Sequence, residues 1–261
     1  MDLVNFKVGS KLIALSILNI LLTERYQSDL TVIPTDDPSF MGVKDYMGMP
    51  TPVFDLSIIL NRQASDKDIK TLIKKLSEFT RQIKNIHAEL SSHYGQAHLD
   101  LTAENLSLLQ QLKQWTKQLD GEDQDLNNLL EKLQSPLQKV LDIHAGEQEA
   151  SSNHRMLSML SQVIRIIEAA AEQVIHSYKP IIVYTTTDGQ SPYIGLLVDS
   201  VGDSMNVEDS DIKSLAKISE TGFKLDPRTA HMLTGIVKSA DDYSLLLDPT
   251  EIFKLDTEAL A

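Results

Sequence analysis

The sequence predicts a β protein that is interrupted by a helical insert: paired small β-barrels, or a β-sandwich, around an antiparallel four-helix bundle. The spacing of Gly and Pro is the first indication. Of 11 glycines only three, and of nine prolines only Pro136, lie between residues 65 and 178. Because Gly and Pro break regular elements, their scarcity there predicts long helices. The flanks instead show strand-like alternation and frequent turn signals, which favour β structure.

The first flank reads as strands separated by turns. Residues 4–8 alternate apolar and polar side chains, and Gly9-Ser10 supplies a tight turn. Residues 11–15 then form the return strand of a hairpin, which runs into a short helical turn. Residues 50–60 predict a further strand, because an apolar run follows the last proline of the segment.

The last flank repeats this plan twice. A strand at 181–187 is followed by Asp188-Gly189, a favoured two-residue hairpin turn, and by a return strand at 193–201. Residues 231–248 predict another strand pair, with its turn near 241–242. Many short strands with turns at this spacing are typical of small barrels or sandwiches.

Four apolar stripes cover the middle of the chain. They span residues 69–90, 106–119, 126–144 and 156–174, and each advances in steps of three and four. That period places the apolar side chains on one face of a helix, so four helices joined by polar loops predict an up-and-down bundle.

The order β, helical, β predicts an insertion into one β fold. Residues 1–62 plus 180–261 would form a discontinuous β domain, and residues 65–178 the inserted bundle. The first flank ends on a strand that lacks a partner set of its own, which favours an insertion over three separate domains.

Composition narrows the classes of function. The net charge of −13 disfavours nucleic acid as a partner, because an acidic surface repels phosphate backbones. The apolar run at 12–22 is too short to span a membrane and lacks the features of a signal peptide. Cysteine is absent, which excludes disulfides and thiolate chemistry and fits a cytoplasmic protein.

No motif for catalysis or for a cofactor is visible. The chain has no phosphate-binding glycine loop, no GxSxG elbow and no HExxH. Its seven histidines show no paired metal-ligand spacing. We therefore predict no enzyme, no catalytic residue, no cofactor and no metal.

The segment "FMGVKDYMGMPTPVFDLS", residues 40–57, is the strongest candidate for a surface function. Two glycines bend it beside Tyr46, Met47 and Met49, and flexible methionines with aromatics often serve partner binding. The same side chains could instead fill the interior of a barrel. The residues alone leave both interpretations open.

Four stretches in order resemble the CheW family of bacterial chemotaxis coupling proteins. They are the opening hairpin at 3–17, the segment at 40–57, "GLLVDSV" at 195–201, and the closing stretch at 231–253. The second resembles the family signature GVxNLRGxxxPVxDL through Gly42, Val43, Gly48, Pro52, Val53, Asp55 and Leu56. The resemblance implies two five-stranded barrels without catalysis, which bridge receptor tips to the regulatory domain of the CheA kinase.

The resemblance also implies a set of partner-binding residues. These are Gly42, Val43, Asp45, Tyr46, Met47, Gly48, Gly195, Val198 and Asp199. This sequence departs from the family at one of them, because the signature Arg is Met47 and the Asn-Leu before it is Asp45-Tyr46. Replacing a cation by a thioether removes any ion pair at that position and puts the partner choice in doubt.

The insert weakly resembles a chemoreceptor zinc-binding bundle that has lost its ligands. In a loose alignment, Gln110 stands at the family's Cys, and Leu137 and Leu141 stand at two of its histidines. Leucines there would make the bundle purely apolar, so we expect it to bind no zinc.

Two functions follow from these patterns. The first is a non-enzymatic chemotaxis adaptor or scaffold that binds a CheA-type regulatory domain, a chemoreceptor tip, or both. The alternative is a sensory module of a chemosensory pathway, whose helical bundle binds a small molecule or a metal.

Overall fold

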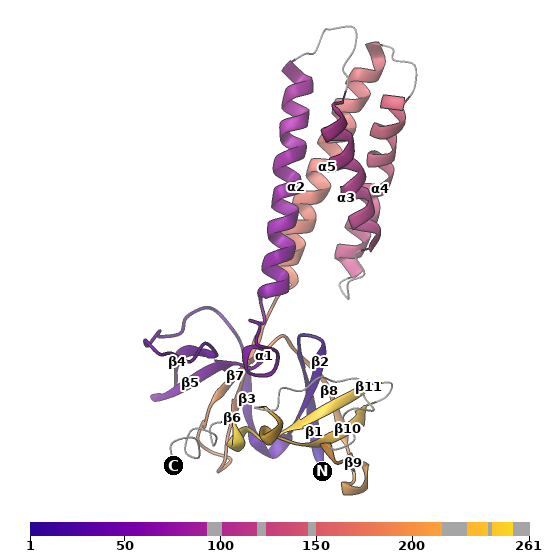
Figure 1. Ribbon diagram of the computed structural model, residues 1–261. Coiled ribbons are helices and arrows are strands. Elements are labelled where there is room, and N and C mark those ends of the chain that lie inside the picture. The colour runs from indigo at the N-terminus through magenta and orange to yellow at the C-terminus, as the bar shows by residue number, and fades with distance from the viewer. Residues whose placement is uncertain (93–100, 119–123, 146–149, 216–228, 240–241, 253–261) are drawn as a thin grey trace. The chain divides into compact units, whose positions relative to one another are not determined.

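The computed structural model divides the chain into two compact units, Met1–Lys67 with Lys179–Ala261, and Asp68–Tyr178 (Figure 1). We call them the β unit and the bundle. The structure describes residues 1–92, 101–118, 124–145, 150–215, 229–239 and 242–252. The predicted fold class, a β protein with a helical insert, is confirmed.

The first sheet of the β unit has six strands in the order β8-β1-β2-β11-β10-β9. Their bounds are β1 (Asp2–Val8), β2 (Lys11–Ser16), β8 (Ser200–Asn206), β9 (Ile212–Lys213), β10 (Leu233–Ser239) and β11 (Asp242–Leu247). The predicted hairpin at the start of the chain is present as β1 and β2, with a 3-10 turn at Ile17–Asn19 after it. The sheet exceeds the expected five strands because the two-residue β9 pairs with β10.

The second sheet has five strands in the order β3-β6-β7-β5-β4. Their bounds are β3 (Ile20–Arg25), β4 (Phe40–Tyr46), β5 (Met49–Asp55), β6 (Ile181–Thr185) and β7 (Gly195–Val198). Strand β5 pairs in parallel with β7, and in the first sheet β2 pairs in parallel with β11. Both sheets therefore take strands from either side of the insert.

The strand predicted at residues 50–60 is wrong in its second half. Strand β5 ends at Asp55, and helix α1 occupies Leu56–Asn61. The side chain of Asp55 accepts hydrogen bonds from the backbone N–H groups of Ser57 and Ile58, which caps the first turn of α1. Leu56 and Leu60 are buried in the core of the β unit, so tertiary packing holds this short helix.

The predicted two-residue turn at Asp188-Gly189 is also wrong, because the connection from β6 to β7 runs from residue 186 to residue 194. Gly189 does adopt a positive φ of 73°. The Asp188 carboxylate accepts backbone bonds from Gln190 and Ser191, and backbone hydrogen bonds join Thr185 to residues 193 and 194 beyond the strand ends. The hydrogen bonds from the backbone N–H groups of Ser191 and Gln190 hold the pKa of Asp188 well below its usual range. The turn predicted near 241–242 lies partly outside the described residues.

The four predicted helices are present as α2 (Lys67–Ser92), α3 (Ala103–Gln118), α4 (Gln124–Ala145) and α5 (Ala150–Ser177). Helix α4 continues through Pro136. Helices α2 and α5 are antiparallel, as two contacts show: Lys84 pairs with Glu168 at 2.6 Å, and His87 lies 2.9 Å from the hydroxyl of Ser161. The stripes predicted from the sequence form one buried apolar core.

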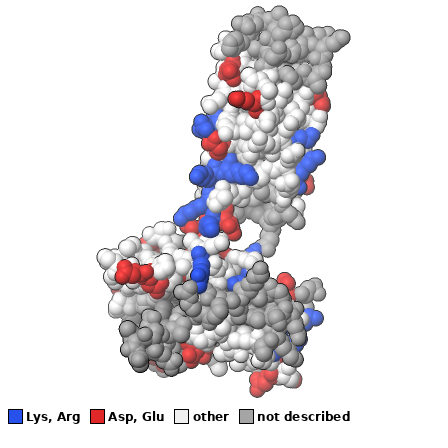
Figure 2. All heavy atoms as spheres, viewed as in Figure 1, with Lys and Arg blue, Asp and Glu red and all other residues white. Residues whose placement is uncertain are grey.

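The bundle carries charged side chains on its outer surface. Figure 2 shows side chains of both charge signs on the face in view. Among the described residues, no helix is long and apolar enough to cross a membrane.

Candidate functional site

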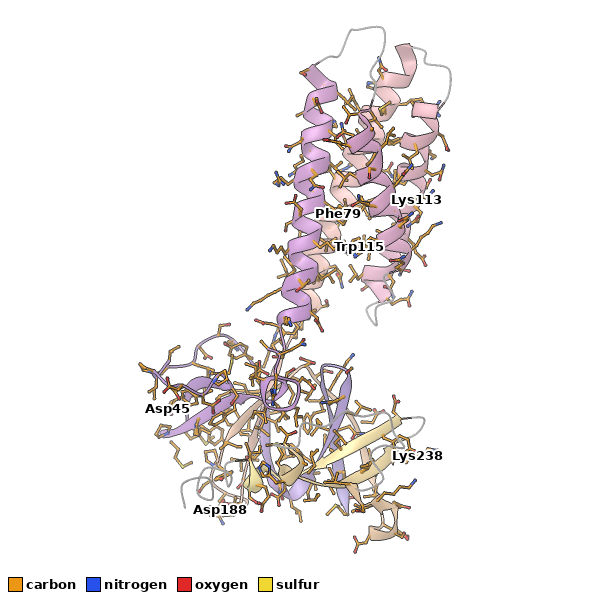
Figure 3. The ribbon with its side chains drawn as sticks, in the orientation of Figure 1. Asp45, Phe79, Lys113, Trp115, Asp188 and Lys238 are labelled. Carbon is orange, nitrogen blue, oxygen red and sulfur yellow. The ribbon has the colours of Figure 1, made fainter. Side chains whose placement is uncertain are left out.

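The β4–β5 hairpin places the central part of the predicted site at an exposed tip. Tyr46 and Met49 form the last strand pair, and Met47 and Gly48 make the two-residue turn between them. Both turn residues have positive φ, 50° for Met47 and 83° for Gly48, as a type I′ turn requires. The Asp45 carboxylate accepts a 2.7 Å hydrogen bond from the Gly48 N–H (Figure 3 labels Asp45). The turn therefore has a defined shape.

Met47 is the most exposed large apolar side chain at this tip. Its relative exposure is 85%, and neighbouring Met49 is 38% exposed. The left-handed conformation of Met47 costs about 1–2 kcal/mol, because the Cβ of a residue other than glycine comes close to a backbone oxygen there. The tip presents the exposed thioether side chain of Met47 at the position where the CheW signature has an Arg.

A set of polar and aromatic contacts across the second sheet holds the hairpin close to its tip. The Tyr46 ring lies 5.3 Å, centroid to centroid, from the buried ring of Tyr184 on β6. The Tyr184 hydroxyl donates a 2.9 Å hydrogen bond to Glu24 on β3. Lys44 on β4 lies 3.5 Å from Glu24 and also pairs with Asp29. These contacts join β3 and β4, the two edge strands of the sheet.

The pKa shifts of Tyr184 and Lys44 follow from these contacts. Burial and the hydrogen bond to Glu24 raise the pKa of Tyr184 above its usual range, so the phenol stays neutral and donates. The hydrogen bond to Asp29 raises the pKa of Lys44, which stays charged. Motif reasoning named neither Glu24 nor Tyr184, because their contacts span about 160 residues of sequence and follow no local pattern.

Gly42 and Val43 serve the construction of the hairpin. Gly42 has a φ of 141°, and a Cβ there would lie 2.7 Å from the backbone oxygen of Thr31. Val43 exchanges two backbone hydrogen bonds with the same Thr31, at 2.9 and 2.8 Å. A glycine at 42 therefore lets the segment before β4 approach closely enough to pair.

The remaining predicted residues are Gly195 and Val198 of β7, and Asp199, which follows this strand. Gly195 is buried, and a Cβ on it would lie 2.9 Å from Ile182 and 3.0 Å from Val53. Val198 packs in the core, and a carboxylate oxygen of Asp199 accepts a 2.6 Å hydrogen bond from the Gly9 N–H. The structure gives all three a role in packing, and partner contact by them stays a prediction.

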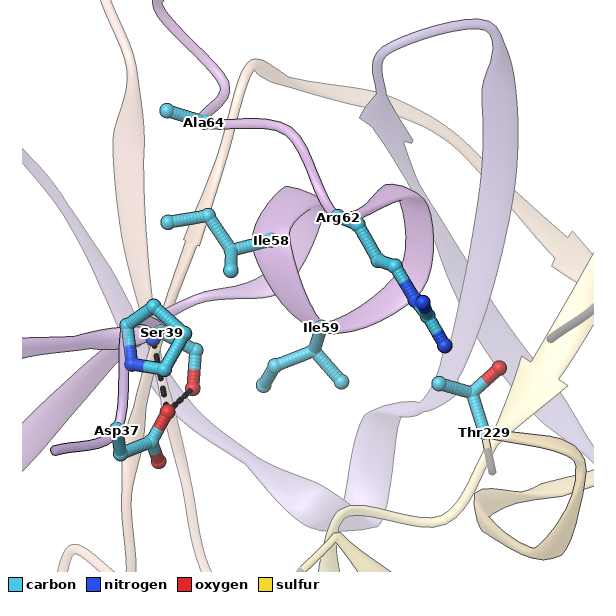
Figure 4. Close-up of a pocket in the computed structure, with 8 residues that line it drawn as sticks. Asp37, Ser39, Ile58, Ile59, Arg62, Ala64 and Thr229 are labelled. Carbon is cyan, nitrogen blue, oxygen red and sulfur yellow. Dashed lines mark hydrogen bonds between the residues drawn. The ribbon is translucent and has the colours of Figure 1, made fainter. Parts of the chain in front are cut away.

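A pocket of about 500 Å³ lies beside α1 in the β unit (Figure 4). Ile58 and Ile59 of α1 supply apolar lining, and Arg62 and Thr229 supply polar groups. On its other side, the Asp37 carboxylate accepts hydrogen bonds from the N–H and the hydroxyl of Ser39. Sequence patterns did not indicate this concave surface, because it joins residues distant along the chain.

The three positions compared with zinc ligands are either exposed on the bundle or packed in its apolar core. Gln110 is exposed, Leu137 is fully buried, and Leu141 packs against the apolar core. Within the described residues no group of three or more His, Cys, Asp or Glu side chains could hold a metal ion. The expectation that the bundle binds no zinc stays a prediction.

Solved structures similar to this chain exist, and one of them matches almost the whole chain. It is the crystal structure of the scaffolding protein TtCheW from Thermoanaerobacter tengcongensis, with a TM-score of 0.46 and 12% sequence identity. The match covers 98% of this chain and 88% of that one. No protein-family model matches the chain, and no curated protein sequence matches it significantly.

Proposed function

We propose that this chain is a non-enzymatic adaptor of a bacterial chemosensory system. It would link the cytoplasmic tip of a chemoreceptor to the regulatory domain of a CheA-type histidine kinase, and therefore act in the cytoplasm. The observation that carries the proposal is the exposed Met47 at the tip of a hairpin whose sequence resembles the CheW signature.

The shape of the tip suits it to binding a protein. The Asp45 hydrogen bond and the strand pairing fix the turn before a partner arrives, so little backbone entropy is lost on association. Methionine adapts its shape to an apolar pocket because its thioether chain is unbranched and polarisable. Full burial of such a side chain contributes about 1.5–3 kcal/mol. That corresponds to roughly 10- to 150-fold in Kd.

The contact of Met47 with its partner should be apolar, whereas the CheW signature has an Arg at this position. Met47 offers no hydrogen-bond donor, so a partner surface built to pair with a guanidinium would keep an unsatisfied acceptor. We therefore propose that the cognate partner carries an apolar pocket facing this tip.

Calorimetric titration of the full chain with the cognate kinase regulatory domain, and with a cognate receptor tip fragment, tests the proposal. We expect Met47→Asp to weaken binding at least tenfold. Leu18→Asp is the matched control, because Leu18 is also apolar and 81% exposed, but lies in the 3-10 turn after β2. Absence of binding to both partners, or equal losses in the two variants, would contradict the proposal.

The alternative function, a ligand-binding module, is favoured by a different observation. It concerns a polar pocket in the bundle and is independent of the hairpin.

A further inference from the structure

A polar pocket of about 470 Å³ lies within the bundle, between α3 and α4. It is lined by Thr116, Lys117, Gln124, Asn127, Leu130, Glu131 and Gln134. All but Leu130 carry polar side chains, although the helices pack around an apolar core elsewhere. Pockets of this size hold small molecules, and a few convergent polar groups set which ligand fits.

The hydrogen bonds of Gln134 fix the orientation of its amide. The Thr116 hydroxyl donates to the backbone oxygen of Lys113, at 3.1 Å, and accepts from Gln134. The Gln134 NH₂ group therefore faces it, at 2.5 Å, and also reaches the Lys113 oxygen at 3.4 Å (Figure 3 labels Lys113). A flipped amide would place its oxygen against the backbone oxygen of Lys113, which has no hydrogen to donate.

This orientation leaves the Gln134 side-chain oxygen without a donor. The atom is buried, and no group in the described part of the chain donates to it. A buried acceptor without a partner costs stability, so its presence beside a pocket indicates that a donor arrives from outside the chain.

The pocket also carries one charge of each sign. Lys117 on α3 and Glu131 on α4 both line it, and both are exposed. Neither forms an ion pair with another described residue. Opposite charges that share a pocket without pairing match a ligand that carries both charges.

We propose that this pocket binds a small zwitterion of the free amino acid class. The ligand ammonium donates to the Gln134 oxygen and is paired by Glu131, while its carboxylate pairs with Lys117. The proposal is independent of the adaptor function, because it uses only α3 and α4. It assigns the insert a sensory role beside the coupling role of the β unit.

Calorimetric titration of the full chain with the twenty common amino acids tests the site. We expect saturable binding of at least one of them. The N-acetyl form and the methyl ester of that amino acid should each bind at least tenfold more weakly, because each removes one of the two charges. If no amino acid binds at concentrations up to about 10 mM, the proposal is overturned.

Variants of the lining residues separate the site from binding elsewhere. Gln134→Leu, Glu131→Gln and Lys117→Met should each weaken binding at least tenfold, whereas Gln110→Leu, on the exposed face of α3, should not. The two charge variants change exposed side chains, so they carry the test even if Gln134→Leu unfolds. Binding that survives both charge variants would place the ligand elsewhere and overturn the assignment.

Discussion

The buried carboxylate of Asp55 should be one of the strongest single supports of the β unit. Asp55 is 2% exposed and lies where β5 ends and α1 begins. One oxygen caps α1 through the N–H groups of Ser57 and Ile58, at 2.8 and 3.3 Å. The other accepts from the N–H and the hydroxyl of Ser65, at 3.0 and 3.1 Å. The carboxylate thus ties the segment before the bundle to the sheet.

The structure sets the size of the effect of Asp55→Ala. Loss of an N-cap costs about 1 kcal/mol. Hydrogen bonds to a charged group contribute about 1.5–3 kcal/mol, and here the Ser65 donors would lose theirs. We therefore expect the free energy of unfolding to fall by about 2.5–4 kcal/mol. Asp37→Ala is the matched control, because Asp37 binds the N–H and hydroxyl of Ser39 in the same way but is exposed, so its loss should stay below about 1 kcal/mol.

Urea unfolding followed by two probes can measure this loss. Trp115 is the only tryptophan and lies in the bundle, so its fluorescence reports that unit, whereas far-UV circular dichroism reports both. With a slope of about 2 kcal/mol per M, the β-unit midpoint should fall by roughly 1.2–2 M. The transition seen by Trp115 should stay in place. A loss for Asp55→Ala no greater than that for Asp37→Ala would refute the reasoning.

Three further outcomes are expected. Leu160→Ala, at a fully buried position of the bundle, should cost about 2.5–5 kcal/mol in the Trp115 transition, and an unchanged transition would contradict the core described above. Met47→Asn should raise the stability of the β unit by about 0.5–1 kcal/mol, since Asn tolerates a positive φ, while partner binding weakens; lower stability would show that the turn is not left-handed. Burial lowers the pKa of Lys11 from 10.5, and its ammonium donates to the Leu60 oxygen. The folded state then binds fewer protons than the unfolded state between the lowered pKa and 10.5, so stability rises with pH there. Urea midpoints should therefore rise relative to Lys11→Met as the pH approaches 10.5, and a constant difference would argue against it.

The sequence by itself determined the division of this protein into β flanks and helices. Gly and Pro are scarce between residues 65 and 178, and the apolar residues there repeat every three or four positions. Both signals are local, because backbone breaking and helix amphipathicity act over one or two turns. The same locality made the bend at Gly48 predictable, since a positive φ at a turn favours glycine, whereas the hairpin of β4 and β5 was not predicted.

Only the tertiary structure decided which of the predicted site residues reach the surface. Met47 is exposed and Gly195 is buried, although the resemblance to one family marked both. Helix α1 follows the same rule: its six residues are too few to form a helix alone, and buried contacts with the β unit hold it. The contact of Tyr184 with Glu24 likewise joins residues far apart in the chain. The same is true of the contact between Gln134 and Thr116, which leaves the Gln134 oxygen without a donor. Local periodicity carries no information about such partners, because the folded chain alone brings them within hydrogen-bond distance.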